Sequence, residues 1–243
     1  MKTITKEELN KVLEEHKLWL ESNEEEGTKA DLSFTILRDL DLRGVDLRDA
    51  NLTCSWLNST NLTGADLHYA DLSNADLSCA DLTKAYLVNA DLNNADLIES
   101  NLRLSNFRGA NLKGADLINA NLNYANLNYA DLKNTNLSGA DLTDTNLNYA
   151  NLAYANLTET ILIGASLSQT SIQNIKGLKV YSIDNIGTFN GKVTYIPKYD
   201  IVYAGCWEGN LEGFLEQGLE MNKKDNKERT NIVLAYQFFK NQI

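Results

Sequence analysis

Every fifth residue from Leu32 to Ile172 is large and apolar, and no insertion interrupts the register. The pattern occupies 29 consecutive positions, of which 27 are leucine and the other two are Phe107 and Ile172. A helix repeats every 3.6 residues and a strand every two, so either element would rotate this pattern around itself instead of holding it on one side. A strict short period over such a distance indicates stacked copies of one small unit.

The remaining positions of the unit indicate how it turns. The residue two before the leucine is Ala in 18 units and Thr or Ser in nine, with Leu40 and Val45 as the exceptions. The residue directly before the leucine is Asp or Asn in 23 units, and Asp, Asn, Ser and Gly tolerate tight turns. We therefore expect a corner once per unit, with the leucine and the small residue inside and each coil stacked on the one before it at strand spacing.

This pattern, seen in Ala65-Asp66-Leu67 and Ala125-Asn126-Leu127, resembles the A(D/N)LXX repeat of the pentapeptide repeat proteins. The resemblance covers residues 30–174. It implies an all-β solenoid, a right-handed quadrilateral parallel β-helix with four units to a coil, which gives about seven coils here. We expect three parts: an N-terminal capping helix and acidic loop (1–29), the β-helix (30–174) and a C-terminal α+β module (175–243).

The N-terminal segment carries the signals of a helix. Thr5 and Glu8 have the spacing of a capping box, and apolar residues follow at helical intervals, which predicts a helix over about 6–22. The first coil of a stack exposes unpaired backbone and the ends of the leucine columns. We expect the helix to cover that end and to pack on the apolar side chains that interrupt the early repeats, namely Phe34, Ile36 and Trp56.

After residue 174 the repeat stops and the composition changes. Runs rich in β-branched and aromatic residues at 179–183, 192–196 and 201–204 predict two or three strands. Two helices are expected to follow, over 211–220 and 227–242. The buried stripe of the second helix is expected to contain Ile232, Ala235, Tyr236, Phe239 and Ile243. The sequence leaves open whether this module closes the rod, joins two rods or binds a partner itself.

The net charge of −11 is concentrated in the repeats. Residues 30–174 hold 17 acidic and 8 basic residues, and 12 of these acids lie before residue 100. A rod of this charge disfavours direct binding of nucleic acid, because neutralising phosphates requires a basic face. The first ten residues are polar and no run is long enough to cross a bilayer, so we expect a cytoplasmic protein without a membrane partner.

Acidic residues are predicted to line up along the rod. With twenty residues per coil, they form two columns on neighbouring faces: Asp76, Asp96 and Asp116 in one, Asp71 and Asp91 in the other. Unit charges ~5 Å apart repel by a little under ~1 kcal/mol even in water, a cost that binding to a partner would offset. The structural alternative is that Asp is part of the repeat consensus and has no binding role, since 12 of the 17 acidic residues occupy the Asp/Asn position.

Tyrosines form a second candidate surface. Tyr129 and Tyr149 share one outward position on consecutive coils, and Tyr124 and Tyr154 lie on the two adjoining faces. Grouped exposed tyrosines are typical of protein-binding surfaces. The structural alternative is that Tyr packs well along stacked strands and was copied with the repeat.

Catalytic and metal-binding chemistry has little support in the sequence. His16 and His68 have no nucleophile set against them, and three cysteines lack the spacing of a metal site. Cys206, just before an expected helix N-terminus, is the one thiol with a special setting, although a buried structural role explains it as well. We expect no enzyme activity, no cofactor and no metal.

These observations favour a non-enzymatic interaction scaffold that presents a rigid acidic surface to a protein partner, and the resemblance implies a bacterial or phage-type protein. The resemblance implies an alternative, because some pentapeptide repeat proteins imitate DNA and bind a type II topoisomerase such as gyrase in its place. The unbroken register leaves no room for the projecting loops that quinolone-resistance members of the family carry. The sequence does not decide between a monomer and a homodimer.

Overall fold

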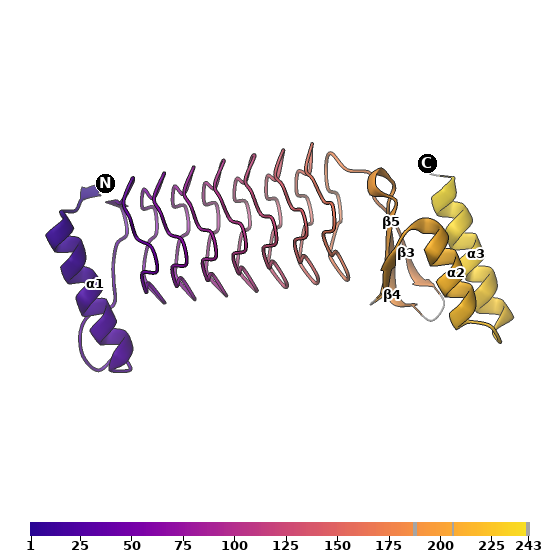
Figure 1. Ribbon diagram of the computed structural model, residues 1–243, viewed down its shortest axis with the longest axis horizontal. Coiled ribbons are helices and arrows are strands. Elements are labelled where there is room, and N and C mark those ends of the chain that lie inside the picture. Colours follow the sequence, from indigo (N-terminus) through magenta and orange to yellow (C-terminus); the bar gives the residue numbers. More distant parts are fainter. Residues whose placement is uncertain (187–188, 206, 242–243) are drawn as a thin grey trace.

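The computed structural model describes residues 1–186, 189–205 and 207–241. A helix and a small α+β module lie at opposite ends of a stack of coils (Figure 1). The elements near the N-terminus are β1 (Lys2–Thr3), α1 (Lys6–Glu21) and β2 (Thr35–Ile36). Those of the C-terminal module are β3 (Tyr181–Ile186), β4 (Phe189–Ile196), a 3-10 turn (Pro197–Tyr199), β5 (Ile201–Ala204), β6 (Trp207–Gly209), α2 (Leu211–Met221) and α3 (Asn226–Lys240). None of the helices in the described part is long and apolar enough to cross a membrane.

The repeats form a parallel β-helix. Isolated parallel bridges join residues twenty apart, from Asp31 with Asn51 to Asn156 with Lys176, and the residue directly before each leucine is the bridging one. Around the bridge residue Asn111, for example, the Leu92 N–H donates to its carbonyl at 2.7 Å and its own N–H donates to Ala90 at 3.0 Å. The expectation that a coil closes after twenty residues is confirmed.

Each unit turns through a left-handed residue two places after the leucine. This position has positive φ in every unit from Phe34 to Asn174, as in Asn94 (φ 55) and Gly114 (φ 71). The bridging Asp or Asn supports the turn, because its side-chain oxygen accepts the N–H of the residue two places later, as Asp96 does from Ile98 at 3.0 Å. Small and polar residues therefore dominate the corners for a conformational reason.

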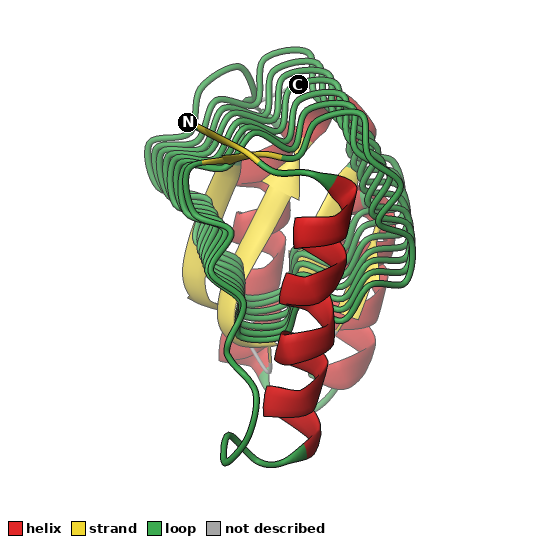
Figure 2. Cartoon of the chain, turned by 90° about the vertical axis from the view of Figure 1, so that its left-hand side faces the viewer, coloured by secondary structure: helices red, strands yellow, loops and turns green. Residues whose placement is uncertain are grey.

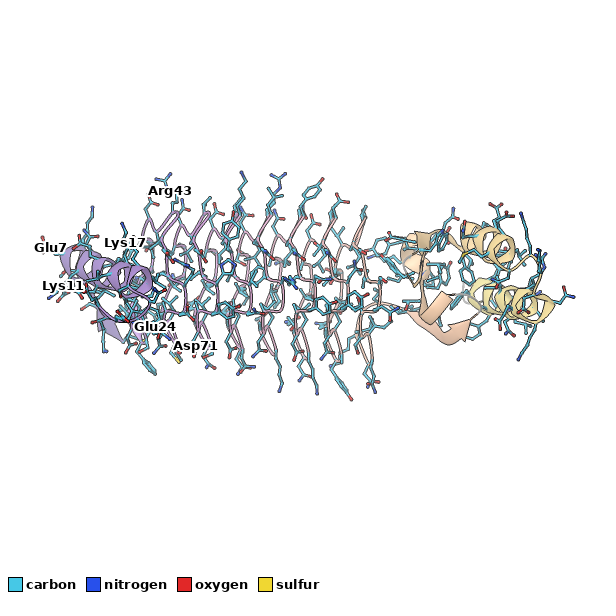
Figure 3. All side chains as sticks on the ribbon, turned by 90° about the horizontal axis from the view of Figure 1, so that it is seen from below. Glu7, Lys11, Lys17, Glu24, Arg43 and Asp71 are labelled. Atoms are coloured by element: carbon cyan, nitrogen blue, oxygen red, sulfur yellow. The ribbon has the colours of Figure 1, made fainter. Side chains whose placement is uncertain are left out.

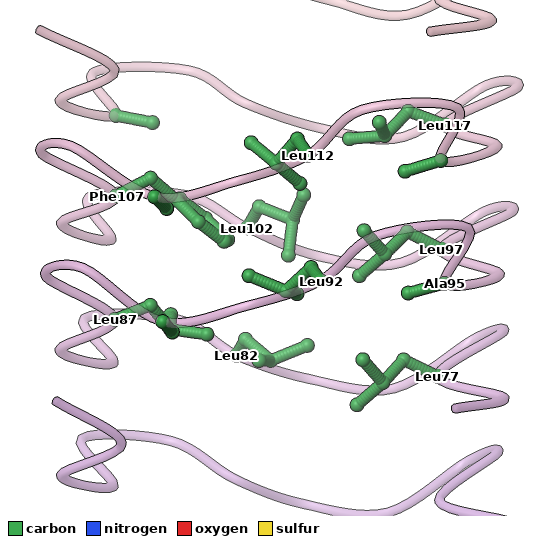
Figure 4. Close-up of a cluster of buried hydrophobic side chains, with 14 of the residues drawn as sticks. Leu77, Leu82, Leu87, Leu92, Ala95, Leu97, Leu102, Phe107, Leu112 and Leu117 are labelled. Atoms are coloured by element: carbon green, nitrogen blue, oxygen red, sulfur yellow. The ribbon is translucent and has the colours of Figure 1, made fainter. Parts of the chain in front are cut away.

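The leucines stack into columns inside the coils, as Figure 4 shows for Leu77, Leu97 and Leu117. All 28 repeat positions from Leu32 to Leu167 are buried, which confirms the inward assignment, whereas Ile172 in the last unit is only half-buried. Burying one leucine side chain contributes roughly 1.5–3 kcal/mol, so the columns supply most of the rod's stability. Because each layer contacts only its neighbours, the rod is held by short-range contacts along its axis.

Helix α1 lies across the first coil, as the end-on view in Figure 2 shows. The capping box is confirmed: the Glu8 N–H donates to the Thr5 hydroxyl at 3.2 Å, and the Thr5 N–H donates to the Glu8 carboxylate at 2.8 Å. Leu9 of α1 is buried in the same cluster as the leucine columns, against the partly buried Leu40 and Val45. These two large residues occupy the position two before the leucine, which is small in the other units, and they form the apolar surface on which the helix packs.

The prediction that the helix packs on Phe34, Ile36 and Trp56 was therefore wrong. Phe34 and Trp56 remain 52% and 41% exposed, since their outward positions point away from the coil axis. Ile36 belongs instead to β2, where it pairs in parallel with Thr3 of β1.

The C-terminal module is a four-stranded antiparallel sheet in the order β3-β4-β5-β6 with α2 and α3 packed together against it. The sequence predicted two or three strands and missed β6, which has only three residues. In β6, Glu208 pairs with Tyr203 of β5. Both helices were predicted correctly. The α3 residues Ile232, Ala235, Tyr236 and Phe239 are buried as expected, while Ile243 lies outside the described residues.

The module is bonded to the last coil. Ile196 and Tyr203 are buried in the cluster that contains the leucine columns. The Tyr203 hydroxyl donates to the Ala165 carbonyl, and the Ser168 hydroxyl donates to the Gly205 carbonyl at 2.5 Å. Burial raises the pKa of Tyr203, so its hydroxyl stays protonated and able to donate.

Candidate protein-interaction surface

The acidic residues lie in the predicted columns. Bridges join Asp76 to Asp96 and Asp96 to Asp116 on one face, and Asp71 to Asp91 on its neighbour. All five are half-buried at the base and project from the rod wall. Bridged residues on adjacent strands lie about 4.8 Å apart, so each column is a row of carboxylates at coil spacing.

Each of these carboxylates also supports its own turn. One oxygen of each accepts the backbone N–H two residues later, at 2.9 to 3.2 Å: Asp71 from Ser73, Asp76 from Ser78, Asp91 from Asn93, Asp96 from Ile98 and Asp116 from Ile118. Burial raises the pKa of Asp71, but hydrogen bonds from the Ser73 hydroxyl and N–H outweigh it, and the net pKa lies below the ordinary value. The turn bonds fix each carboxylate in position, and at Asp71 they favour the charged form.

No basic side chain among the described residues forms an ion pair with these five carboxylates. The ion pairs made by arginines of the described rod lie at other carboxylates: Arg43 contacts Asp41 at 2.6 Å, and Arg48 contacts Asp46 at 2.7 Å. Figure 3 shows Arg43 and Asp71 projecting from opposite sides of the rod. Within the described chain the columns thus carry no ion pair, and Lys29 acts on Asp71 only through space.

The structure brings together only two of the four predicted tyrosines. The rings of Tyr129 and Tyr149 stack with centroids 4.8 Å apart at an angle of 11°, and both are about half exposed. Tyr124 instead lies under Arg103, and Tyr154 lies under Lys133, each with the cation 5.8 Å from the ring centroid. All four occupy the left-handed turn position, which directs them outward.

Sequence reasoning missed two features of the surface. Glu99 is exposed at the corner next to Asp96 and extends the acidic area, and its outward position in the unit could have shown this. His68 contacts the Asp66 carboxylate through Nδ1 and stacks on Tyr86, with ring centroids 5.9 Å apart. The stacking of His68 on Tyr86 could be predicted only with the coil geometry, since Tyr86 follows His68 by almost a full coil.

The candidate catalytic groups stay apart. His16 is a buried residue of α1, whereas His68 faces outward on the rod. Cys54 and Cys79 are free thiols, and Cys206 lies outside the described residues. Over the described ranges, no three His, Cys, Asp or Glu side chains are grouped to hold a metal ion.

The chain matches the family described as pentapeptide repeats, in eight copies over residues 28–64, 65–103, 100–139 and 140–176. It belongs to the pentapeptide repeat family. This family implies a right-handed β-helix, in agreement with the twenty-residue pairing. No curated protein matches the chain.

Solved structures of other pentapeptide repeat proteins are similar to it. Rfr23 from the cyanobacterium Cyanothece 51142 is 39% identical over 40% of this chain and 63% of its own length, with a TM-score of 0.27. HetL from the cyanobacterium Nostoc sp. strain PCC 7120, a protein involved in heterocyst differentiation regulation, is 27% identical over 71% of this chain and 94% of its own, with a TM-score of 0.22. A trypsin-treated variant of QnrB1, a plasmid-mediated fluoroquinolone resistance protein, is 18% identical over 58% of this chain and 80% of its own, with a TM-score of 0.43. The chain thus spans less than two thirds of the length of Rfr23.

Proposed function

We propose that this protein is a non-enzymatic, cytoplasmic scaffold that binds a protein partner through the acidic columns of its β-helix. In this proposal the chain has three parts: the N-terminal capping helix and acidic loop (1–29), the β-helix (30–174) and the C-terminal α+β module (175–243). The middle part is a four-sided rod of about seven coils, and the other two cover its ends.

The observation that carries the proposal is the fixed charge of the acidic columns. Five carboxylates stand in two columns at coil spacing, are fixed by turn bonds and form no ion pair among the described residues. Fixed charges lose no side-chain entropy when they meet a complementary surface, so they suit recognition of a basic face on a partner. The stacked Tyr129 and Tyr149 supply a second, apolar contact area.

The repeat offers a clean test, because Asn occupies the same position as Asp in many units and keeps the turn bond. The double substitution Asp76→Asn and Asp96→Asn removes two charges from one column. The matched control, Asp81→Asn and Asp141→Asn, removes two charges from another face. Affinity capture from the native host should retain a partner on the wild type and on the control but lose it on the column variant. Equal capture by all three proteins would sink the proposal.

A second candidate is mimicry of DNA toward a type II topoisomerase. It is favoured by the regular row of carboxylates in the columns, which resembles the repeating charge of a phosphate backbone. Gyrase supercoiling assays with increasing amounts of the protein test it. Inhibition or protection that is lost in the column variant would support this candidate, and no effect at any concentration would remove it.

A further inference from the structure

One buried imidazole joins α1 to the start of the β-helix. The His16 side chain is fully buried and stacks on Trp19 of the same helix, with ring centroids 5.7 Å apart. Its Nδ1 accepts the backbone N–H of Ala30 at 3.1 Å. Ala30 is the first inward small residue of the first coil, so this bond crosses from the helix to the rod.

The bond fixes the protonation state of the ring. A backbone N–H can only donate, so Nδ1 must carry a lone pair and the single proton of the neutral ring lies on Nε2. Within the described residues, Nε2 is buried and has no hydrogen-bond partner of normal geometry. A second proton would have to enter at Nδ1, where it would face the Ala30 N–H and break the bond.

The charges around the ring act in both directions. Burial lowers the pKa of His16, and Lys29 in the loop after α1 lowers it further. The solenoid groups Asp46, the Arg48 backbone and Asp49 raise it. Burial is the largest effect, so the net pKa lies below the ordinary value of 6.5. From α1 itself the ring meets the uncharged indole of Trp19.

We propose that His16 is a pH-sensitive latch that holds α1 on the first coil when its ring is neutral and releases the helix on acidification. The released helix binds a proton more readily than the docked one, because the docked ring has the lower pKa. Docking is therefore fully favoured above about pH 6.5 and weakens as the pH falls through the lower, docked value. Release would expose the coil end that α1 covers, including the inner ends of the leucine columns.

Hydrogen exchange measured by mass spectrometry on the full chain tests this latch. Peptides from residues 6–30, corrected for intrinsic exchange, should lose protection between about pH 7.5 and about pH 5, while peptides from 60–120 stay protected. His16→Asn supplies an acceptor that does not titrate, so its α1 should stay protected at both pH values. His68→Asn changes the only other histidine and should behave as the wild type does.

Two results would overturn the proposal: protection of α1 in the wild type at about pH 5, or an equal loss in His16→Asn. If His16→Asn is already undocked at neutral pH, NMR titration of the wild type decides. The ring should titrate below 6.5, and the Ala30 amide signal should change with the same midpoint. A ring that titrates at 6.5 or above, or an amide that does not follow it, refutes the latch.

Discussion

The Tyr199 hydroxyl donates to the Thr160 carbonyl oxygen at 2.9 Å and accepts the Leu162 N–H at 3.2 Å. In every earlier coil, the equivalent carbonyl and N–H pair with one bridging residue of the next coil. A side chain of the C-terminal module thus replaces the coil that would have followed. At this wall the solenoid ends in satisfied hydrogen bonds instead of an open strand edge.

Tyr199→Phe should loosen the end of the rod. It leaves the Leu162 N–H without its partner, while the Thr160 carbonyl keeps the Lys198 ammonium at 3.4 Å. The loss of the partner of a buried N–H costs about 1–3 kcal/mol. Amide exchange of Leu162 should accelerate, while amides in the middle of the rod keep their protection. Tyr124→Phe, in an exposed ring on the rod wall, is the control. Unchanged exchange at Leu162 would show that the hydroxyl does not seal the coil.

Leu97→Ala should destabilise the rod strongly. Leu97 is fully buried in a column between Leu77 and Leu117, and the cavity left by the substitution should cost about 2–5 kcal/mol in the free energy of unfolding. The exposed corner residue Asn94 is the comparison. Asn94→Ala should cost only about 1 kcal/mol, because alanine tolerates the left-handed turn less well than asparagine. Equal costs in urea denaturation would contradict the inward assignment.

Two glycines at the same corner position should respond differently to alanine. A Cβ at Gly114 would lie 2.5 Å from the Asn94 side-chain oxygen, whereas a Cβ at Gly64 would meet nothing within 4 Å. Both have positive φ, so both variants bear a strain of roughly 1–2 kcal/mol, and Gly114→Ala should bear an additional clash. Adding Asn94→Gly to Gly114→Ala should remove the difference between the two glycine variants, because it deletes the side chain that the new Cβ meets. A Gly64→Ala variant as unstable as Gly114→Ala would refute this interpretation.

Acid should weaken the turns. The pKa of Asp71 and Asp141 lies below the ordinary value of 3.8, because hydrogen bonds from the serine or threonine two residues later outweigh burial. The folded state therefore prefers the ionised form. Its stabilisation is complete above about pH 4 and is lost as the pH falls through the lowered value. Unfolding curves of Asp71→Asn between about pH 5 and 2 should depend less on pH than those of the wild type. Identical curves would mean that the turn bond does not couple to ionisation.

Much of the rod could be read from the sequence because one unit is repeated. A five-residue period fixes which side chain points inward, and once twenty residues close a coil, the columns containing Asp76 and Asp96 follow by counting. The hydrogen bonds of each turn follow from the same template.

The ends could not be read in this way, because they are built once and depend on tertiary contacts. Leu40 and Val45 looked like imperfect repeats, yet they are the residues that receive α1. Tyr199 and Tyr203 lie about forty residues after the carbonyls that they bond, and no local pattern connects them. The pairing of Tyr124 and Tyr154 with basic side chains likewise required the coil geometry.

The most direct test of the proposed function is the affinity of the captured partner at low and at raised salt for the wild type, the column variant and its matched control. Fixed charges at Asp76 and Asp96 predict binding that weakens as salt rises. They also predict a column variant that binds at least about tenfold more weakly at low salt, and a control that matches the wild type. Affinity that is independent of salt and equal in all three proteins would contradict recognition through the acidic columns.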